Sequence, residues 1–336
     1  MPHATLRACA AALLAVCPAV ASALDEQRAE VQDFIRHMVE RHGFATAELG
    51  DVLRQAESRP SIVAAMQRPA EKTLAWHEYR AKFLTERRIT RGVETGRQQA
   101  AALQRAAGHG VPAEVMLAIT GVETFYGENT GKHRVVDALS TLAFDYPPRS
   151  TFFRGELEQF LLMARDEALD PLVPVGSYAG AMGIPQFIPS SFRNWAVDGD
   201  GDGHRDLWRN WSDVFASIGN YLEGHGWRPG EPVMVVADVA GADLAGVEVT
   251  KVALSETAGS LRRRGVKFDA ALPDDAPAVL LQLAGSQGAE HRVGFTNFFA
   301  ITRYNRSMLY ASAVNDLAVA IAAASAPPAP VAAPAE

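Results

Sequence analysis

Cysteine is almost absent from this 336-residue sequence, which has only Cys9 and Cys17. Both lie in a leading segment that we expect to be removed, so the mature chain would have no thiol and no disulfide. Positive charge is also scarce, because 39 acidic residues outnumber 32 Lys and Arg and give a formal net charge of -7. Without a strong positive field to attract phosphates, a nucleic acid is excluded as the expected partner.

The first 23 residues are typical of a signal peptide. Arg7 precedes an apolar run at 8–20, too short to span a bilayer, and small residues at 21–23 form a cleavage site. We therefore predict a periplasmic protein; a buried N-terminal helix is the structural alternative. Cys17 follows a stretch that resembles a lipoprotein box with Val16 in place of a small residue, so an outer-membrane lipoprotein is the alternative location.

The pattern of apolar residues divides the rest of the chain into parts. With 48% hydrophobic residues, the chain can bury a substantial core. We predict an α+β fold that is predominantly helical, with a small inserted β-rich subdomain and a solvated Ala/Pro tail. The expected boundaries are a helical domain at 24–110, a mostly helical core at 111–230, a β-rich insertion at 231–293, a return to the core at 294–322 and the tail at 323–336.

Local signals set some of the expected element boundaries. Gly43 should end a first helix whose apolar stripe begins at Val31, and Ser150 and Ser212 are candidate N-caps of two later helices. The insertion contains three apolar runs that read as strands, at 232–239, 246–254 and 277–285.

The segment 111–127 (VPAEVMLAITGVETFYG) predicts a helix that begins near Pro112 and stops at Gly127. Glu123 shares an apolar stripe on it with Met116 and Ile119. Burial and the negative end of the helix dipole should both raise the pKa of Glu123, as a general acid requires. From spacing alone, a Glu paired with an Arg or capping a loop amide is an equally good interpretation.

An acidic loop begins as an EF-hand calcium loop does, with Asp198, Asp200 and Asp202 alternating and Gly203 at the sixth position. His204 and Asp206 follow at the seventh and ninth positions, but Arg209 replaces the usual twelfth-position Glu. The alternative is an exposed Asp/Gly turn. If the loop binds Ca²⁺, we expect a structural role with oxygen ligands only, including the carbonyl of His204.

The sequence resembles the B-type family of membrane-bound and soluble lytic transglycosylases. The resemblance rests on long segments in order over roughly residues 76–310, a far more specific signal than one short motif. They are GVETFYG around Glu123, DALSTLAFDYPPRS from Asp137, ELEQFLLMARDE from Glu156, GSYAGAMGIPQFIPSSF from Gly176, AVDGDGDGHRDLW from Ala196 and FTNFFAITRYNRS from Phe295.

The resemblance implies a lysozyme-like catalytic core, in which Glu123 cleaves the MurNAc–GlcNAc bond of peptidoglycan as acid and then as base. The product is a 1,6-anhydro sugar, and no water and no cofactor enter the chemistry. It also implies that Asp213 closes the calcium loop at 198–213, although this chain has one extra residue before it. The residues implied to bind substrate are Tyr79, Arg149, Ser177, Gln186, Tyr304, Asn305 and Tyr310; Pro148 stands where the family commonly has a second arginine beside Arg149.

Two other functions remain compatible with the sequence. A muramidase would use water as the nucleophile and commonly a second carboxylate, which the spacing does not reveal. A catalytically silent peptidoglycan-binding protein would keep the fold without the reaction. The expected partners are peptidoglycan strands and proteins of cell-wall synthesis, and the expected oligomeric state is a monomer.

Overall fold

The computed structural model describes residues 22–67 and 74–326, so residues 1–21 of the expected signal peptide, Cys17 among them, and most of the tail lie outside the described residues, whereas Ser22 and Ala23 lie inside them. Within them the chain is predominantly helical, as predicted. The helices are α1 (Ala29–His42), α2 (Thr46–Gln55), α3 (Pro60–Met66), α4 (Trp76–Phe83), α5 (Glu86–Gln98), α6 (Ala100–Ala106), α7 (Ala113–Thr124), α8 (Val135–Asp145), α9 (Ser150–Asp166), α10 (Pro189–Trp195), α11 (Trp211–Gly224), α12 (Ala258–Arg263), α13 (Thr296–Tyr304) and α14 (Met308–Ser325), with short 3₁₀ turns η2 (Ala107–His109) and η3 (Pro147–Arg149).

The strands form three small antiparallel sheets. Two of these are two-stranded pairs, and the third is a four-stranded sheet in the order β5-β8-β7-β6. In this sheet Leu280 of β7 pairs with Val293 of β8. The strands are β1 (Ser22–Ala23), β2 (Glu57–Ser58), β3 (His133–Arg134), β4 (Val175–Gly176), β5 (Met234–Ala237), β6 (Glu256–Thr257), β7 (Pro277–Gly285) and β8 (Gly288–Gly294).

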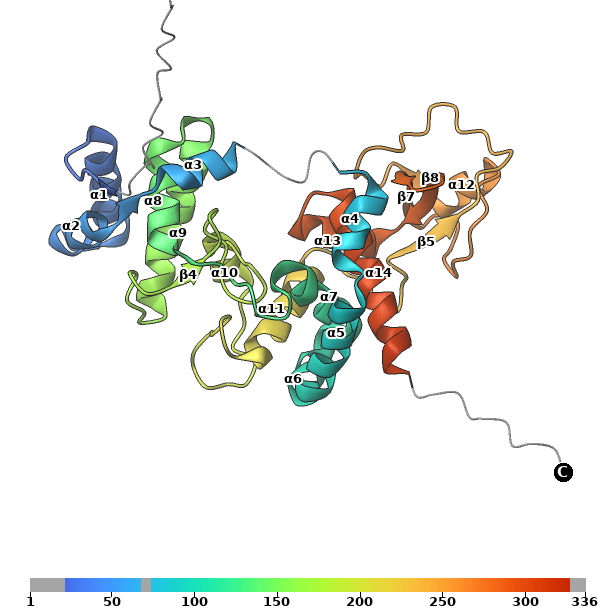
Figure 1. The fold of residues 1–336 in the computed structure, drawn as a ribbon, viewed down its shortest axis with the longest axis horizontal. Coiled ribbons are helices and arrows are strands. Elements are labelled where there is room, and N and C mark those ends of the chain that lie inside the picture. Colours follow the sequence, from blue (N-terminus) through green and yellow to red (C-terminus); the bar gives the residue numbers. More distant parts are fainter. Residues whose placement is uncertain (1–21, 68–73, 327–336) are drawn as a thin grey trace, which may run out of the picture.

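The expected helical domain at 24–110 is divided between two parts of the molecule. Helices α1 to α3 lie at one end beside α8 and α9, whereas α4 to α6 lie with α7 and α14 (Figure 1). The reason is packing: α3 is packed on α8, α5 on α7 and α14, and α6 on α11. Helical periodicity predicts which face is buried, but not which partner covers it.

The four-stranded sheet lies at the opposite end of the molecule from α1 and α2 (Figure 1). The first and third apolar runs of the insertion form β5 and β7, as predicted. The prediction of a strand over 246–254 was wrong, since this run has no regular strand. Strand β6 pairs with Pro277 and Ala278 at the start of β7, and the run 246–254 meets this strand through one hydrogen bond, from the amide of Gln282 to the carbonyl of Val249 at 3.1 Å, which is too little to form a ladder.

Several helix ends differ from the sequence-based expectations. Gly43 does end α1, in the left-handed conformation. Ser150 is the first residue of α9 and not its cap, and α11 is capped by Asn210, whose side chain accepts from the amide of Ser212. Helix α14 continues to Ser325, three residues into the expected tail. Capping depends on the backbone angles of the preceding residue, which spacing does not give.

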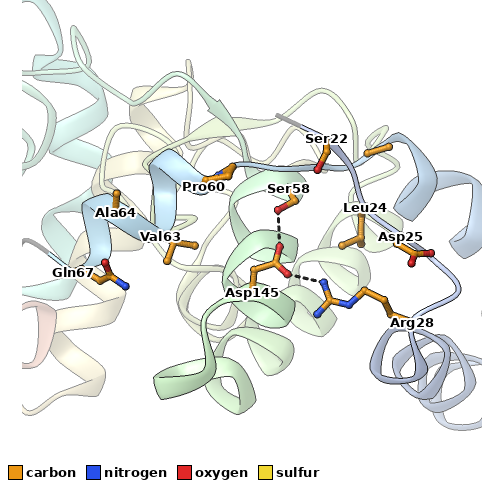
Figure 2. A pocket seen from close by; sticks show the side chains of 11 residues that line it. Ser22, Leu24, Asp25, Arg28, Ser58, Pro60, Val63, Ala64, Gln67 and Asp145 are labelled. Atoms are coloured by element: carbon orange, nitrogen blue, oxygen red, sulfur yellow. Dashed lines mark hydrogen bonds and ion pairs between the residues drawn. The ribbon is translucent and has the colours of Figure 1, made fainter. Parts of the chain in front are cut away.

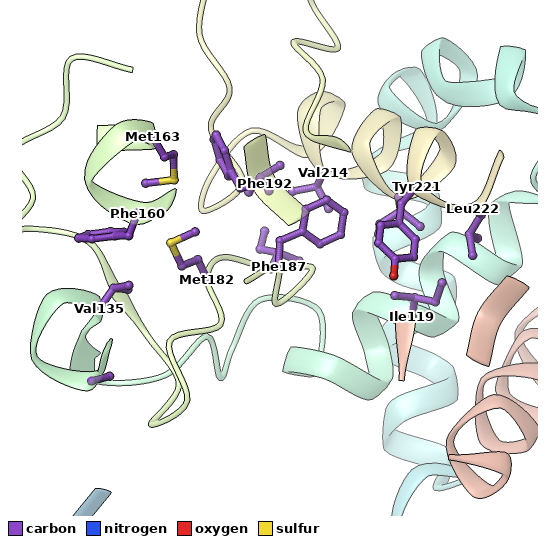
Figure 3. Close-up of a cluster of buried hydrophobic side chains, with 14 of the residues drawn as sticks. Ile119, Val135, Phe160, Met163, Met182, Phe187, Phe192, Val214, Tyr221 and Leu222 are labelled. Carbon is purple, nitrogen blue, oxygen red and sulfur yellow. The ribbon is translucent and has the colours of Figure 1, made fainter. Parts of the chain in front are cut away.

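Helix α14 is the one helix in the described part of the chain that is long and apolar enough to cross a membrane by length and composition. Here it packs against α7, α5 and α4. One continuous core extends from these helices to α1 at the far end, through residues such as Phe160, Phe187 and Phe192. Figure 3 shows part of it, where Phe187 lies between Met182 and Tyr221.

Candidate active site

Glu123 lies in the last turn of α7, which is buried on nearly every side. Every residue from Val115 to Gly121 is buried, so the expected single apolar stripe is not what singles out Glu123. The glutamate is half-buried and lines a cavity of about 290 Å³. A carboxyl group at the end of a buried helix, facing an open cavity, can reach a ligand while its backbone stays fixed.

Helix α7 does not stop at Gly127 as predicted. Phe125 and Tyr126 follow it with φ of 53° and 58°, the left-handed region that is unfavourable for large side chains. The ring of Tyr126 is buried and its hydroxyl donates to the carbonyl of Arg88 at 2.9 Å. Packing of the aromatic side chains therefore ends the helix at Thr124 and holds Glu123 in the terminal turn.

Thr124 joins the end of α7 to the glycine-rich loop. Its hydroxyl donates to the carbonyl of Ile184 at 2.9 Å and accepts from the amide of Gly127 at 3.0 Å. Within the loop, Gly183 has a φ of 69°, and a Cβ there would lie 2.5 Å from the carbonyl oxygen of Leu207. A close approach of two backbone segments thus requires glycine at this position and fixes the loop beside Glu123.

Tyr310 is the predicted residue in direct contact with Glu123. It lies in the first turn of α14, is buried, and donates a hydrogen bond from its hydroxyl to Oε1 of Glu123 at 2.6 Å. Burial, then the charge of Glu123, raises the pKa of Tyr310 well above its usual value. The phenol therefore stays protonated and acts as a hydrogen-bond donor to the glutamate.

The structure brings Gln186, Tyr304 and Asn305 together with Glu123 on the wall of the same cavity. Gln186 is half-buried and donates from Nε2 to the carbonyls of Thr130 and Gly183, at 3.1 and 2.9 Å, which orients its amide. Tyr304 donates to the carbonyl of Pro185, and its ring is nearly parallel to that of Tyr310 with centroids 6.5 Å apart. These groups can offer hydrogen bonds and an aromatic face to a sugar.

Three other predicted residues do not line this cavity. Tyr79 is buried in a cluster with Trp76 and Leu283. Arg149 lies over the ring of Phe152 at 4.4 Å. The hydroxyl of Ser177 accepts from the amides of Ala179 and Ala181, at 3.2 and 3.1 Å, and so shapes the turn of the glycine-rich loop.

Sequence reasoning missed three polar residues on the cavity wall: Ser191, Tyr221 and Arg303. Tyr221 was expected only as part of the apolar stripe of α11, yet its hydroxyl donates to the carbonyl of Arg303 at 2.7 Å. Ser191 and Arg303 occur within the segments that carry the family resemblance. No spacing rule marks them, because α10, α11 and α13 meet here only in the folded chain.

A second hollow, of about 480 Å³, lies between the N-terminal strand and the end of α8. Figure 2 shows Asp145 at its centre. The carboxylate of Asp145 accepts from the hydroxyl of Ser58 at 2.5 Å and from Nη1 of Arg28 at 2.6 Å. Both oxygens of Asp145 are thus hydrogen-bonded, and the second acid of the hollow, Asp25, is exposed and accepts from the amide of Gln27 at 3.0 Å, so we assign the hollow no role in catalysis.

The acidic loop brings the carboxylates of Asp198, Asp200 and Asp202 within 4.8 Å of one another. Hydrogen bonds from backbone amides, that of Gly203 first, lower the pKa of Asp198 and keep it charged. Three such groups repel one another unless a cation joins them, and carboxylate oxygens are the ligands that Ca²⁺ prefers. The loop therefore fits a calcium ion.

Asp213 and Asp206 are placed differently from those three residues. Asp213 is fully buried and accepts from the amides of Gly199 at 2.8 Å and Asp206 at 2.7 Å. Burial, with a further contribution from Asp200 and Asp198, raises the pKa of Asp213 to about 6. Asp206 Oδ1 accepts from the amides of Trp208 and Arg209, at 2.8 and 3.0 Å. Asp213 thus holds the two ends of the loop together through its backbone, whereas Asp206 shapes the turn that follows it.

Comparison with known proteins gives a consistent result. Residues 26–319 match the family described as the transglycosylase SLT domain. The chain is 43% identical over 303 residues to membrane-bound lytic murein transglycosylase B of Escherichia coli K12, covering 87% of this chain and 82% of that protein.

Two solved structures are also similar to this fold. The catenated lytic transglycosylase SltB1 of Pseudomonas aeruginosa is 47% identical, with a TM-score of 0.86 over 90% of this chain and 99% of that one. The Escherichia coli lytic transglycosylase Slt35, solved in complex with calcium, is 41% identical, with a TM-score of 0.81 over 89% and 94% of the two chains.

Proposed function

This chain belongs to the transglycosylase SLT domain family, and from this membership we propose that it is a lytic transglycosylase that cuts the MurNAc–GlcNAc bond of peptidoglycan. One observation carries the proposed mechanism: among the described residues that line the cavity, Glu123 is the one acid. Hydrolysis with water commonly needs a second carboxylate to act as base or nucleophile. A lytic reaction needs only one, because the substrate supplies its own nucleophile.

In the proposed reaction, Glu123 first donates a proton to the leaving O4 of GlcNAc as the bond from C1 of MurNAc breaks. The ionised Glu123 then takes the proton from the C6 hydroxyl of the same MurNAc, whose oxygen forms the new bond to C1. The product is a 1,6-anhydro end, and the glutamate regains its proton. Tyr310 supports this cycle because its hydroxyl donates to the carboxylate form.

Substrate recognition is proposed for the walls of the cavity. Gln186 and Asn305 would bind hydroxyl and N-acetyl groups, and Tyr304 would pack on a sugar ring. Ser177 and Tyr79 would act by shaping the loop and the packing around Tyr310. We propose that Arg149, outside the cavity, meets the peptide stem of a bound strand.

The decisive experiment is mass analysis of muropeptides released from purified sacculi. Anhydro ends, one water lighter than reducing ends, are expected from the parent protein, whereas reducing ends would identify a muramidase. Glu123→Gln should lower the rate about 1,000-fold, within the usual range for loss of a general acid and base. Glu128→Gln is the matched control, since that side chain is 41% exposed and pairs with Arg87 and Arg91 at 3.5 Å.

Either of two results would contradict this assignment. Full activity of Glu123→Gln would show that the glutamate is not the acid. Binding to sacculi without release of any product by the parent protein would identify a peptidoglycan-binding protein instead.

We propose that the acidic loop holds a structural Ca²⁺ through Asp198, Asp200, Asp202 and the carbonyl of His204, with Asp206 and Asp213 bracing the loop. A calcium complex of the related Slt35 supports this proposal. Removing divalent ions with a chelator should lower the melting temperature, and calcium should restore it by mass action. Asp200→Asn should abolish that response. Asp170→Asn, on an exposed turn, is the control, and an unchanged response in Asp200→Asn would contradict the site.

For location we propose the periplasm after removal of residues 1–23, with lipidation at Cys17 as the alternative. The name of the Escherichia coli relative, which describes it as membrane-bound, supports a place in the cell envelope. The mass of the protein purified from envelopes distinguishes a chain that begins at Leu24 from one that begins at a lipid-modified Cys17. Partners among cell-wall synthesis proteins and a monomeric state remain part of this proposal.

A further inference from the structure

Two histidines and a glutamate converge where the N-terminal helix α1 meets α9, away from the catalytic cavity. Nε2 of His37 lies 3.0 Å from Oε2 of Glu158, and Nε2 of His42 lies 2.8 Å from Oε1 of the same carboxylate. The three ligand atoms lie within 4.8 Å of one another. Figure 1 shows α1 at the end of the molecule that carries α8 and α9, so this cluster joins segments more than 110 residues apart.

The chemistry of this cluster suits a transition metal ion. Zn²⁺ binds imidazole nitrogen and carboxylate oxygen at about 2.0–2.2 Å, which places neighbouring ligand atoms of a tetrahedron about 3.3 Å apart. The two nitrogen–oxygen separations, each to a different oxygen of Glu158, are within half an ångström of that value. Two nitrogens and one carboxylate are ligands typical of zinc and poorly suited to calcium.

Burial leaves the cluster both ordered and accessible. The side chains of His42 and Glu158 are only 18% and 19% exposed, whereas that of His37 is 41% exposed. An ion could therefore enter from the side of His37 and keep a water as its fourth ligand. The two rings lie 5.9 Å apart at 79°, so neither ring covers the other.

The backbone around the cluster is held by other contacts. Nη1 of Arg165, in the last turn of α9, donates to the carbonyl of His42 at 2.8 Å. The same guanidinium lies 4.5 Å from the centre of the Phe44 ring. The end of α1 is thus fixed on α9 before any ion binds, which lowers the cost of assembling the site.

We propose that His37, His42 and Glu158 form a structural site for Zn²⁺ or a similar transition metal ion, which fastens α1 to α9. Helix α9 in turn supports α10, because Glu156 accepts hydrogen bonds from the amide and hydroxyl of Ser190 at 3.0 and 2.7 Å. The ion would therefore stabilise the N-terminal helices against the part of the molecule that carries the glycine-rich loop.

The test is titration of the chelator-treated full chain with Zn²⁺ in excess calcium, followed by calorimetry, with Co²⁺ absorption as the readout of ligand geometry. We expect one zinc per chain, a tetrahedral Co²⁺ spectrum and a raised melting temperature. His42→Ala and Glu158→Gln should each weaken binding on the order of 100-fold. Glu158→Gln preserves the shape of the side chain. If this variant is folded and binds Zn²⁺ more weakly, the loss of affinity is due to removal of the carboxylate ligand.

His109→Ala is the matched control, because His109 pairs with Glu223 at 2.7 Å elsewhere in the molecule and forms no three-ligand cluster with other residues that the structure describes. It should bind Zn²⁺ as the parent does. No zinc binding by the parent, or equal binding by His42→Ala and Glu158→Gln, would overturn the proposal and leave a hydrogen-bonded His–Glu–His cluster.

Discussion

At the scale of single residues, the contact between Tyr310 and Glu123 is the one most directly tied to the proposed chemistry. The two side chains are 187 positions apart, yet their oxygens lie 2.6 Å apart. The tyrosine is one of a set of neighbouring aromatic side chains, since Tyr304 is stacked on it and Tyr221 lies against Tyr304 with centroids 5.0 Å apart. This packing orders the hydroxyl before substrate arrives, which is what electrostatic preorganisation requires.

Tyr310→Phe should lower the turnover number about 10-fold to 100-fold while leaving the fold intact. The reason is that a hydrogen bond to a charged group contributes about 1.5–3 kcal/mol, and this one is made to the carboxylate form that appears after proton donation. Release of anhydro-muropeptides measures the rate, and circular dichroism checks the fold. Tyr126→Phe removes a hydroxyl bound to a backbone carbonyl and should change turnover little. Equal losses in both variants would mean that only packing matters.

At the scale of elements, the end of α7 depends on the ring of Tyr126, which packs between α5 and α7 where each helix has a glycine. A Cβ added at Gly121 of α7 would lie 2.7 Å from Cζ of Tyr126, and one added at Gly92 of α5 would lie 2.5 Å from its hydroxyl. The ring therefore fills the space between α5 and α7. Its position keeps the left-handed residues after Thr124 in place and, with them, Glu123.

Gly121→Ala should destabilise the protein by about 1–3 kcal/mol, because the added methyl group overpacks a buried site. It should also reduce glycan cleavage, since relief of the clash displaces the turn that carries Glu123. Urea unfolding and muropeptide release measure the two effects. Gly155→Ala in α9 is the control, because its Cβ meets nothing and should stabilise the helix by about 0.5–1 kcal/mol. A stable, fully active Gly121→Ala protein would contradict this account.

At the scale of the whole molecule, Asp316 of α14 links elements from three parts of the chain. Its Oδ2 lies 3.0 Å from Nη2 of Arg292 on β8 and 2.9 Å from Nε of Arg80 on α4. Arg292 and Asp316 are each 10% exposed at the side chain. Burial opposes the charge of Asp316, but the hydrogen bonds and charges of Arg292 and Arg80 outweigh it and lower the pKa.

Asp316→Asn should reduce the free energy of unfolding at neutral pH by about 3–5 kcal/mol, because the buried Arg292 would lose its closest acidic partner and keep the longer ion pair with Glu290 at 3.7 Å. The pKa of Asp316 is lower in the folded protein than in the unfolded protein, where it is near 4. Its ionised carboxylate therefore stabilises the fold above about pH 4, and this stabilisation is lost as the pH falls through the pKa of the folded protein. The difference between parent and variant should therefore be full above about pH 4 and shrink below it. Urea unfolding at several pH values measures this.

Asp274→Asn is the comparison variant, since that carboxylate is 70% exposed and pairs with Arg262 at 2.7 Å. It should cost less than about 1 kcal/mol. A pH-independent difference for Asp316→Asn would exclude ionisation of Asp316 as the cause.

The sequence by itself determined the predominantly helical class, the position of Glu123 in a helix, the acidic loop and most of the apolar runs that became helices or strands. These properties follow from local periodicity and from residue types at short spacing, so folding is not needed to read them. The strand expected over 246–254 and the caps expected at Ser150 and Ser212 were wrong, because pairing partners and backbone angles outside the segment decided them.

Only the tertiary structure decided which residues meet. It placed Tyr310 on Glu123, added Ser191, Tyr221 and Arg303 to the cavity, and divided residues 24–110 between two parts of the molecule. It also joined Glu158 to two histidines of α1. Contacts between residues so far apart in sequence form when buried faces of different elements pack together. The residue pattern within one helix or strand does not specify which element packs against it.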